Sequence, residues 1–461
     1  MIKNRAKFNF EDLFILFGQN DLHNINNDIL VEGISIDTRT INQGNAFFAL
    51  KGANSDGHSR VNDAFELGAS LAFVEQNWYI QNKEELKDLP IIVVKNSYKA
   101  LGETANYHRS RFSIPIIAVA GSNGKTTTKE LIASVLSTKF NVLKTYKNYN
   151  NQLGVPLMLL QLDESHTAAV IEMGTNSFGE IAELSKIVNP NHALITNINK
   201  EHLEVLIDID GVEIEETNLF NYAKKHDIFS YINLDDTRLK KYTMVLEKRV
   251  SYGFTNEAML VGDVEYDDNL MPTITAKFNQ KELTAKINVP GYPGAINALA
   301  ASAIGLNLDL SEEEVKKGLE SFTPDTSTEY GRLSVINKNN IKIINDTYNA
   351  NPGSVAEMIN LVSSFKDKKN IHIVLGDMLE LGEETAKEHQ LILDNAKSVT
   401  TQIYTYGPIY NSVDRNLNFE NKSEITSKLL NSLADNDIIL VKGSRGMKME
   451  EVVTEILNKI N

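Results

Sequence analysis

The sequence predicts an α/β protein of three domains built around parallel sheets. The chain has 461 residues, enough for about three domains that each bury a core. Short apolar runs alternate with segments of helical spacing over most of its length, as expected for strands and helices that alternate. One such run, residues 114–120, enters a turn rich in glycine ahead of a helical segment, and this pattern is typical of an anion site.

Composition excludes several classes of protein. Apolar residues make up 42% of the chain and charged residues 23%, as in ordinary globular proteins. The net charge of -15 argues against a broad nucleic-acid or anionic-membrane surface. There is no cysteine, which excludes disulfides, thiolate catalysis and cysteine-based zinc sites. No apolar run reaches the length of a signal peptide or a membrane span, so we expect a cytoplasmic protein.

We expect the first domain at residues 1–112. Strands are predicted at 34–39, 46–50 and 71–74, with a helix at 61–68. Polar residues fall at strand ends and in loops, where ligand contacts are common. His58 fits either a hydrogen-bonded loop residue or a catalyst. The candidate ligand-binding residues of this domain are Asp37, Thr38, Arg39, Asp56, Gly57 and His58.

The second domain, expected at 113–323, opens with a candidate phosphate loop. A buried strand runs into Gly121, and a helix is predicted from Lys125 to residue 140. Backbone amides there can point at phosphate oxygens, Lys125 supplies a charge, and Thr126 is placed to reach a magnesium ion. The strict P-loop spacing needs glycine where this chain has Val119. A turn that only packs a helix is the alternative.

Two further strands of this domain end in polar residues. Strands are predicted at 168–174 and 192–198, separated by a helix at 179–188. In parallel sheets, ligands bind at the carboxyl ends of strands. Glu172 and His202 follow two such ends, and Glu172 is a candidate magnesium ligand or, alternatively, a capping or salt-bridging carboxylate. Alternating segments at 254–289 predict a small antiparallel part, and an alanine-rich helix follows a turn at 291–308.

In the third domain, expected at 324–461, predicted strands and helices again alternate. Strands are predicted at 341–348, 371–378, 402–407 and 437–444, with helices at 354–365 and 384–395. Polar groups again follow the strands. They are Asp346, Asn349, Asn351, Asp377, Glu380, Lys442, Ser444 and Arg445.

Together these segments resemble the Mur ligase family over essentially the whole chain. GSNGKTT at 121–127 is similar to the family's phosphate loop, and Asn148, Asn150, Asn151, Gly154 and Pro156 match its NxNNxxGxP segment. EMG at 172–174, and TNI at 196–198 together with His202, are also similar to segments of the family. DTR and DGH in the first domain, DTYNANP at 346–352, LGDMLELG at 375–382 and KGSR at 442–445 resemble one branch. That branch joins D-alanyl-D-alanine to UDP-N-acetylmuramoyl-tripeptide.

The resemblance implies an ATP-dependent, ADP-forming amide ligase of peptidoglycan synthesis that works through an acyl phosphate. It implies that Lys125 holds phosphates, that Thr126, Glu172 and His202 hold Mg²⁺, and that the first domain binds the UDP-sugar peptide. It also implies small-molecule partners and no nucleic acid or membrane, and we expect a monomer. The implied ATP-site residues are Gly121, Ser122, Asn123, Gly124, Lys125, Thr126, Thr127, Asn297, Arg332 and Asp346. The implied substrate residues are Asp37, Thr38, Arg39, Asn148, Asn151, Asn349 and Asn351.

Three segments depart from the family pattern. Glu216 stands where the family has a carbamylated lysine, whose head group also ends in carboxylate-like oxygens. Glu216 is therefore a candidate catalytic residue, although a solvated acidic helix face is the alternative, since Glu213 and Glu215 flank it. VLIDID at 205–210 replaces a loop rich in glycine and serine. GYPGAIN at 291–297 lacks a His-Asn pair ahead of Asn297, which predicts the loss of one nucleotide contact at Gly294.

Two classes of function follow. The first is an active ligase, acting on the substrates above or on another acid and amine by the same mechanism. Folylpolyglutamate synthesis is disfavoured by the DTR and DGH pattern. The second is a binding paralogue without turnover. The phosphate-loop lysine and the other implied site residues favour the active ligase.

Overall fold

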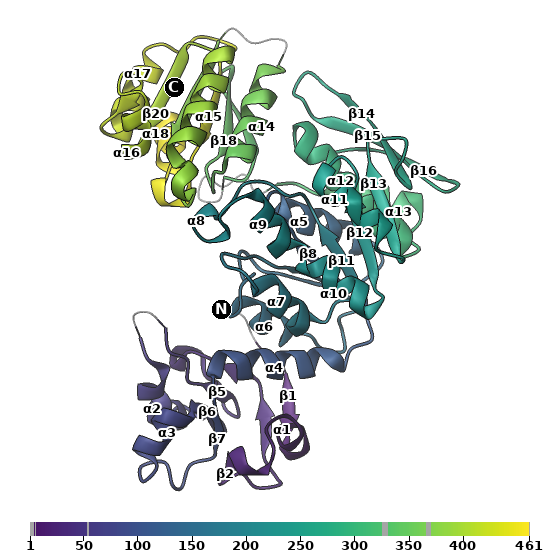
Figure 1. The fold of residues 1–461 in the computed structure, drawn as a ribbon, viewed down its shortest axis with the longest axis vertical. Coiled ribbons are helices and arrows are strands. Elements are labelled where there is room, and N and C mark those ends of the chain that lie inside the picture. The colour runs from purple at the N-terminus through teal and green to yellow at the C-terminus, as the bar shows by residue number, and fades with distance from the viewer. Residues whose placement is uncertain (1–3, 5, 53–54, 325–330, 366–369, 461) are drawn as a thin grey trace. The chain divides into compact units, whose positions relative to one another are not determined.

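The computed structural model describes residues 4, 6–52, 55–324, 331–365 and 370–460. The chain forms two compact units by its contacts. The first comprises residues 1–118, 140–174 and 180–193, and the second comprises residues 119–139, 175–179 and 194–461. Figure 1 shows the helices and strands of both. No helix among the described residues is long and apolar enough to cross a membrane.

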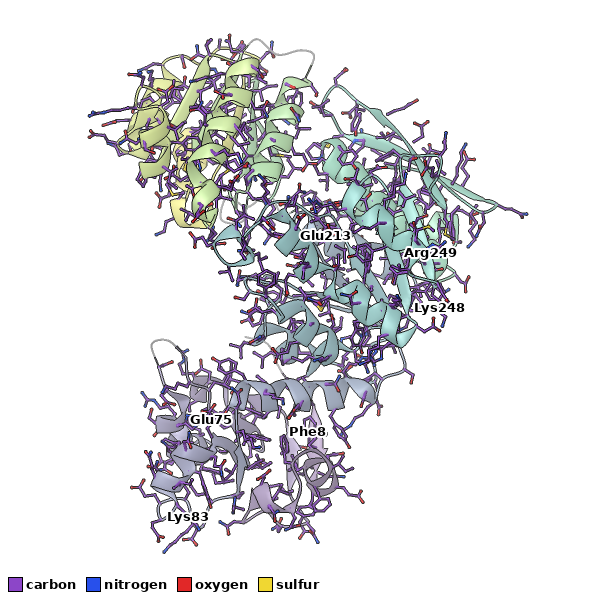
Figure 2. All side chains as sticks on the ribbon, in the orientation of Figure 1. Phe8, Glu75, Lys83, Glu213, Lys248 and Arg249 are labelled. Atoms are coloured by element: carbon purple, nitrogen blue, oxygen red, sulfur yellow. The ribbon has the colours of Figure 1, made fainter. Side chains whose placement is uncertain are left out.

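The first unit contains a five-stranded sheet of order β2-β7-β6-β5-β4. Its strands β4 to β7 are parallel, and β2 pairs antiparallel with β7. A two-stranded sheet of β1 and β3 carries Phe8, which is buried (Figure 2). The strands are β1 (Lys7–Asn9), β2 (Leu22–His23), β3 (Leu30–Glu32), β4 (Ile34–Ser35), β5 (Ala46–Phe48), β6 (Leu71–Glu75) and β7 (Ile91–Val94).

The predicted strand at residues 34–39 is wrong beyond Ser35. The chain leaves the sheet there and forms a 3₁₀ turn, Thr38–Thr40. Asp37 causes the change, because its side chain accepts a hydrogen bond from the Arg39 amide and caps the turn. The helices of the first unit are α1 (Phe10–Phe17), α2 (Val61–Glu66), α3 (Gln76–Asn82), α4 (Ser97–Ser110), α6 (Gly154–Leu159) and α7 (Glu180–Val188).

A nine-stranded sheet has the order β16-β15-β14-β13-β12-β11-β8-β10-β9. Strands β12, β13 and β14 are parallel neighbours, whereas β14, β15 and β16 form the antiparallel part predicted from the sequence. Strands β9, β12 and β13 were not predicted from the sequence. The strands are β8 (Ile116–Ala120), β9 (Val142–Lys144), β10 (Ala168–Glu172), β11 (His192–Ile195), β12 (Phe229–Asn233), β13 (Arg249–Gly253), β14 (Leu260–Tyr266), β15 (Pro272–Phe278) and β16 (Lys281–Lys286).

Helices of the second unit connect and cover these strands. The helix after the phosphate loop packs against the alanine-rich helix, whose small side chains allow close approach. The helices that connect and cover these strands are α5 (Lys125–Leu136), α8 (Leu203–Leu206), α9 (Ile209–Glu216), α10 (Asn218–His226), α11 (Thr237–Lys240), α12 (Gly291–Asn307) and α13 (Glu312–Ser321).

The C-terminal part of the second unit has its own six-stranded sheet, of order β17-β18-β22-β19-β20-β21. Strands β18, β22, β19, β20 and β21 are parallel, as the sequence predicts for an α/β rhythm. The strands are β17 (Ser334–Lys338), β18 (Ile341–Asp346), β19 (Ile371–Gly376), β20 (Gln402–Tyr406), β21 (Asn418–Phe419) and β22 (Ile438–Lys442). The helices are α14 (Pro352–Ser363), α15 (Thr385–Val399), α16 (Pro408–Val413), α17 (Lys422–Leu430) and α18 (Glu450–Lys459).

Candidate active site

The phosphate loop joins β8 to α5, as predicted. Gly121 and Gly124 have φ values of 112° and 78°, which L side chains rarely adopt. A Cβ on Gly121 would lie 2.3 Å from Thr196 Oγ1, and one on Gly124 would lie 3.2 Å from the Asn297 amide. The loop therefore needs both glycines. The amides of Gly121, Ser122 and Asn123 donate to Glu216 Oε2, the Asn197 carbonyl and Asn197 Oδ1, so an anion would face the amides that follow, at the start of α5.

Lys125 crosses the loop from the first turn of α5. Its ammonium donates to the Ser122 carbonyl at 3.1 Å and to the Gly121 carbonyl, and it lies 3.8 Å from Glu201 Oε2. The side chains of Lys125 and Glu201 are 16% and 9% exposed. A cation this well buried interacts with nearby charges far more strongly than a surface lysine would.

Two carboxyl groups, Glu201 and Glu216, lie beside this lysine. Glu216 Oε2 accepts a hydrogen bond from the Gly121 amide at 2.7 Å. Burial raises the pKa of Glu201 to about 8, Lys125 opposes that shift, and Glu216 adds to it. Burial also raises the pKa of Glu216, against the effects of Lys125 and the Gly121 amide. The sequence did not single out Glu201, whose role depends on contacts between separate elements.

The acidic run on α9 is buried, so the alternative of a solvated acidic helix face is wrong. Glu213 and Glu216 are 7% and 0% exposed (Glu213 is labelled in Figure 2). Each carboxylate has its own partners: Glu213 pairs with Arg238 at 2.7 Å and with Lys241, whereas Glu215 accepts from the Gly179 amide at 2.6 Å. Glu216 bonds to the phosphate loop through the Gly121 amide.

The three predicted magnesium ligands occupy different surroundings. Thr126 Oγ1 is buried and has no hydrogen-bond partner among the described residues. His202 lies in the second unit with it, and its Nδ1 is 2.5 Å from Glu380 Oε2. Glu172, in the first unit, is 1% exposed and accepts from Asn150 Nδ2 at 2.9 Å. Its place at the end of β10 agrees with the strand-end position predicted for it.

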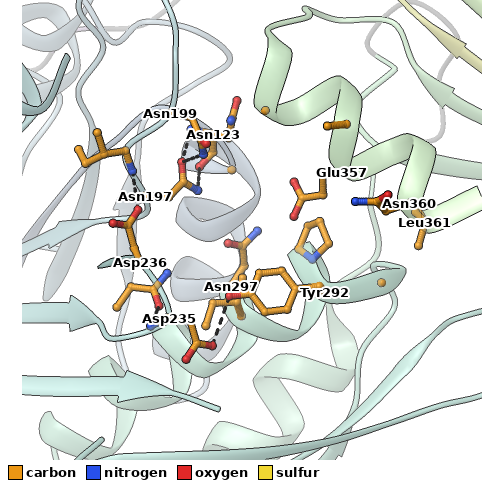
Figure 3. Close-up of a pocket in the computed structure, with 18 of the residues that line it drawn as sticks. Asn123, Asn197, Asn199, Asp235, Asp236, Tyr292, Asn297, Glu357, Asn360 and Leu361 are labelled. Atoms are coloured by element: carbon orange, nitrogen blue, oxygen red, sulfur yellow. Dashed lines mark hydrogen bonds between the residues drawn. The ribbon is translucent and has the colours of Figure 1, made fainter. Parts of the chain in front are cut away.

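A cavity of about 750 Å³ opens beside the phosphate loop within the second unit (Figure 3). Its wall includes Asn123 and Asn297, and Glu357 of α14 points into it. Tyr292 also lines it and donates from its hydroxyl to Asp235 Oδ2 at 3.3 Å. Burial raises the pKa of Glu357 to about 7. The cavity offers acceptors and an aromatic ring, which suit the nucleoside end of a nucleotide better than its phosphates.

The glycine at 294 has a packing reason. A Cβ there would lie 1.9 Å from the Val289 carbonyl oxygen, so a side chain does not fit without movement of the backbone. The neighbouring Tyr292 and Pro293 line the cavity instead. Sequence reasoning missed Tyr292, although a tyrosine in the turn ahead of the alanine-rich helix was the available signal.

The C-terminal part of this unit contributes further predicted residues. Asn351 Nδ2 donates to Asn123 Oδ1 at 2.8 Å, which brings the DTYNANP segment to the phosphate loop. Asp346 accepts from the Leu333 amide at 3.0 Å and forms an ion pair with Lys442. Lys442 also donates to the Asn349 carbonyl at 2.9 Å. The guanidinium of Arg332 lies over the ring of Tyr348, 3.5 Å from its centroid.

The predicted substrate residues of the first unit have local hydrogen bonds. Arg39 is bonded to the Asp37 carboxylate through Nε at 2.9 Å. Asn151 Oδ1 accepts from the Gly154 amide at 2.9 Å, at the first residue of α6, whereas Asn148 is exposed. His58 is 3% exposed, bonds to Asp56 through Nδ1 at 2.6 Å and accepts from the Glu75 amide through Nε2 at 3.0 Å. Both ring nitrogens of His58 are thus engaged, as in a hydrogen-bonded loop residue.

Comparison with known proteins agrees with this geometry. Family models match at residues 30–109 (Mur ligase family, catalytic domain), 119–305 (Mur ligase middle domain) and 331–445 (Mur ligase, glutamate ligase domain). The chain belongs to the Mur ligase family and has its three-domain α/β architecture.

Individual relatives cover almost the whole chain. The UDP-N-acetylmuramoyl-tripeptide–D-alanyl-D-alanine ligase of Bacillus subtilis is 33% identical over 93% of each chain. The enzyme of the same name from Buchnera aphidicola is 32% identical over 94% of this chain and 93% of its own. A crystal structure of MurF from Acinetobacter baumannii matches with a TM-score of 0.86 at 28% identity, covering 99% of this chain and all of the other.

Proposed function

We propose that this protein joins D-alanyl-D-alanine to UDP-N-acetylmuramoyl-tripeptide at the expense of ATP, in the cytoplasmic synthesis of peptidoglycan precursors. The terminal carboxylate of the tripeptide attacks the γ-phosphorus of ATP, and an acyl phosphate and ADP form. The dipeptide amine then attacks the acyl carbon, the amide bond forms, and inorganic phosphate leaves. One observation carries the proposal: a phosphate loop with its buried lysine lies in a chain that matches an enzyme of this name over 93% of its length.

In this reaction the protein contributes position and charge more than covalent chemistry. The amides of Gly124 to Thr127, at the start of α5, and the Lys125 ammonium hold the β- and γ-phosphates. Lys125 then turns from its own loop carbonyls toward the phosphate oxygens, which are stronger acceptors. The nucleoside lies in the cavity beside Asn297, where Tyr292 and Glu357 supply the remaining contacts.

The residues present fit a magnesium ion. Thr126 Oγ1 is buried and lacks a hydrogen-bond partner among the described residues, which suits a hydroxyl that binds a cation. Thr126, Glu172 and His202 would hold the ion, and its charge would reduce the repulsion between the phosphates and the substrate carboxylate. Among the described residues there is no group of three or more acidic or histidine side chains that could hold a metal ion, and in this proposal phosphate oxygens would complete the ligand set.

Glu216 takes the place of the family's carbamylated lysine in this proposal. Its Oε2 is fixed by the Gly121 amide, and its Oε1 has no hydrogen-bond partner within the described structure. A carboxylate held beside Lys125 supplies the charge and oxygen atoms of a carbamate without carbon dioxide. The acidic side chain therefore removes a requirement for bicarbonate.

Other residues complete the substrate sites. Arg332 and Asp346 act on the nucleotide when the C-terminal domain closes, and closure excludes water from the acyl phosphate. We place the domains at 1–112, 113–323 and 324–461 and infer a monomer. The muramoyl-peptide and amine are held by Asp37, Thr38, Arg39, Asn148, Asn151, Asn349 and Asn351.

The proposal is tested by ADP release from the purified protein with UDP-N-acetylmuramoyl-tripeptide and D-alanyl-D-alanine, against a panel of other acids and amines. We expect turnover that depends on both named substrates. Turnover only with another pair would keep the mechanism and replace the substrates, a result that the altered 205–210 segment makes worth testing. No turnover with any pair, while ATP still binds, would favour a binding paralogue.

A further inference from the structure

A carboxyl group without a partner faces the cavity beside the phosphate loop. Glu357 lies in the second turn of α14 and points into this cavity (Figure 3). Its carboxyl oxygens form no hydrogen bond and no ion pair with any residue that the structure describes. Burial raises the pKa of Glu357 to about 7, Asp346 adds to this shift, and Lys442 opposes it. The Lys442 ammonium is already bonded to Asp346 and to the Asn349 carbonyl.

Stability does not explain an acid at position 357. A carboxyl group removed from water without a hydrogen bond costs free energy in its ionised form. Leu361, which is one turn further along α14, lines the same cavity with an apolar side chain. An unpaired acid on the wall of a cavity is typical of a binding site. Glu357 therefore indicates a ligand that supplies the missing hydrogen-bond donors.

Helix α14 shows which part of a nucleotide Glu357 faces. Its N-cap residue, Asn351, donates to Asn123 of the phosphate loop at 2.8 Å, so the helix begins at the phosphate end of the cavity. Glu357 follows six residues later, about 9 Å along the helix axis. Asn360 and Leu361 line the cavity another turn further on. Glu357 thus lies between the phosphate end and the far end of the cavity, where the ribose of a nucleotide lies between its phosphates and its base.

The chemistry of the side chains agrees with this placement. A carboxylate only accepts hydrogen bonds, and its two oxygens match the two neighbouring hydroxyls of a ribose. Acidic side chains hold a ribose hydroxyl in dinucleotide-binding sites. Phosphates are themselves negatively charged acceptors and do not suit Glu357. Asn360, at the far end, carries an amide that both donates and accepts, as the edge of a base requires.

We propose that Glu357 is a specificity-determining residue for the nucleotide: its carboxylate accepts hydrogen bonds from the 2′- and 3′-hydroxyls of the ribose and so selects ribonucleotides over 2′-deoxyribonucleotides. This inference rests on the proposed function, which places the nucleoside of ATP in this cavity. It gives α14 a role in nucleoside binding besides its contact with the phosphate loop.

The test compares the binding of ATP and 2′-deoxy-ATP to the full-length protein with Mg²⁺, by calorimetric titration at pH 8.5, where the carboxyl is ionised. We expect the wild type to bind 2′-deoxy-ATP at least about tenfold more weakly than ATP, the loss typical of a hydrogen bond to a charged group. Glu357→Ala should weaken ATP binding and bring the two affinities within about twofold of each other. Glu357→Gln should fall between, because its amide oxygen still accepts.

Asn360→Ala is the matched control. Asn360 lies on α14 one turn beyond Glu357 and lines the same cavity. Its replacement should keep the wild-type ratio between the two nucleotides, whatever its effect on both affinities together. The melting temperature of each variant without nucleotide reports whether the fold is kept. Glu357→Ala should melt no lower than the wild type, because it removes an unpaired acid.

Three results would overturn the inference. Equal affinity of the wild type for ATP and 2′-deoxy-ATP would show that no side chain reads the 2′-hydroxyl. The full wild-type ratio in Glu357→Ala would assign that contact to another residue. Inosine triphosphate, which lacks the amino group of adenine, gives the third: a preference for ATP over it that is lost in Glu357→Ala would place the carboxylate at the base.

These titrations contain neither the acid nor the amine substrate, so they separate the inference from the proposed function. Absence of turnover with the named substrates, in a protein that shows the expected nucleotide preference, would refute the proposed reaction and leave the role of Glu357 intact. Turnover with those substrates and no preference between the two nucleotides would do the reverse. A protein that binds no nucleotide would refute both.

Discussion

Glu216 accepts a hydrogen bond from the backbone amide of Gly121 at 2.7 Å, across 95 positions of sequence. The bond ties the end of α9 to the first residue of the phosphate loop. Glu216 lies near Lys125, and a second buried carboxyl group, that of Glu201, lies 3.8 Å from the same ammonium. The Lys125 ammonium thus faces two carboxyl groups whose pKa values are raised by burial.

Glu216→Ala should abolish ADP release, which means a loss of at least about 100-fold in kcat/KM. The substitution removes the carboxylate that we place in the role of the carbamate, and the wild type should need no added bicarbonate. The assay is ADP release in buffer stripped of carbon dioxide and then supplied with bicarbonate. Glu213→Ala is the matched control, because Glu213 is buried on the same helix but pairs with Arg238 and Lys241. Full activity of Glu216→Ala, or activation of the wild type by bicarbonate, would contradict this prediction.

Lys125→Met should lower the stability of the protein as well as its affinity for ATP. At pH 9, where Glu201 is ionised, removing the cation leaves this buried carboxylate without compensation, and breaking a buried pair typically costs about 3–5 kcal/mol. The comparison is therefore made at pH 9. The melting temperature without nucleotide reports this effect, and calorimetric titration reports ATP binding. The double variant Lys125→Met, Glu201→Gln should recover much of the stability and none of the ATP affinity. An unchanged melting temperature in the single variant would show that the lysine does not stabilise the carboxyl groups.

The sequence predicted the parts of this protein that local chemistry determines. Gly121, Gly124 and Lys125 stand in a fixed order between a buried strand and a helix, and the structure confirms the loop. The α/β class and the antiparallel part at 254–289 are confirmed for the same reason, since apolar periodicity is local. Family membership followed from motifs spread over the chain and is confirmed as well.

What the sequence could not provide depends on contacts between distant segments. Glu201 was not singled out from the sequence, because its role depends on its contact with Lys125 and on the nearby Glu216. The acidic run on α9 looked equally like a solvated face, because charge alone does not tell which residues a helix buries. The strand predicted at 34–39 is wrong beyond Ser35, because the side-chain hydrogen bond of Asp37 to the Arg39 amide competes with backbone hydrogen bonds of the sheet.

The raised pKa of Glu201 makes stability depend on pH. The folded protein holds a proton at this carboxyl up to a pKa of about 8, whereas the unfolded chain releases it near the ordinary value of 4.5. Stability should therefore fall as pH rises from 4.5 to 8 and level off above, by up to about 1.4 kcal/mol per pH unit for one proton.

Glu201→Gln, which cannot ionise, should flatten this slope and raise the melting temperature relative to the wild type at pH 8. The measurement is the melting temperature between pH 5 and 8.5. Glu66→Gln, an exposed position on α2, is the control and should keep the wild-type slope. A Glu201→Gln profile parallel to that of the wild type would show that this proton is not retained on folding.

Gly121→Ala should cost more than an ordinary left-handed glycine does, because two effects add. A left-handed residue with a side chain costs about 1–2 kcal/mol wherever it stands. At Gly121 the new Cβ would also lie 2.3 Å from Thr196 Oγ1 and 2.7 Å from the Thr196 amide nitrogen, so the loop or the end of β11 must shift. Gly179→Ala isolates the first effect, since φ is 92° there and no atom lies within 4 Å of a Cβ.

We expect Gly179→Ala to lose only the backbone cost and to bind ATP normally, whereas Gly121→Ala should melt at a lower temperature and bind ATP at least about tenfold more weakly, equivalent to 1.4 kcal/mol. The shift would also break the bond to Glu216, whose donor is the Gly121 amide itself. Differential scanning calorimetry and ATP titration of the two variants decide the matter. Equal behaviour of the two variants would mean that the loop tolerates a side chain at its entrance, and that close approach to Thr196 is not what holds its shape.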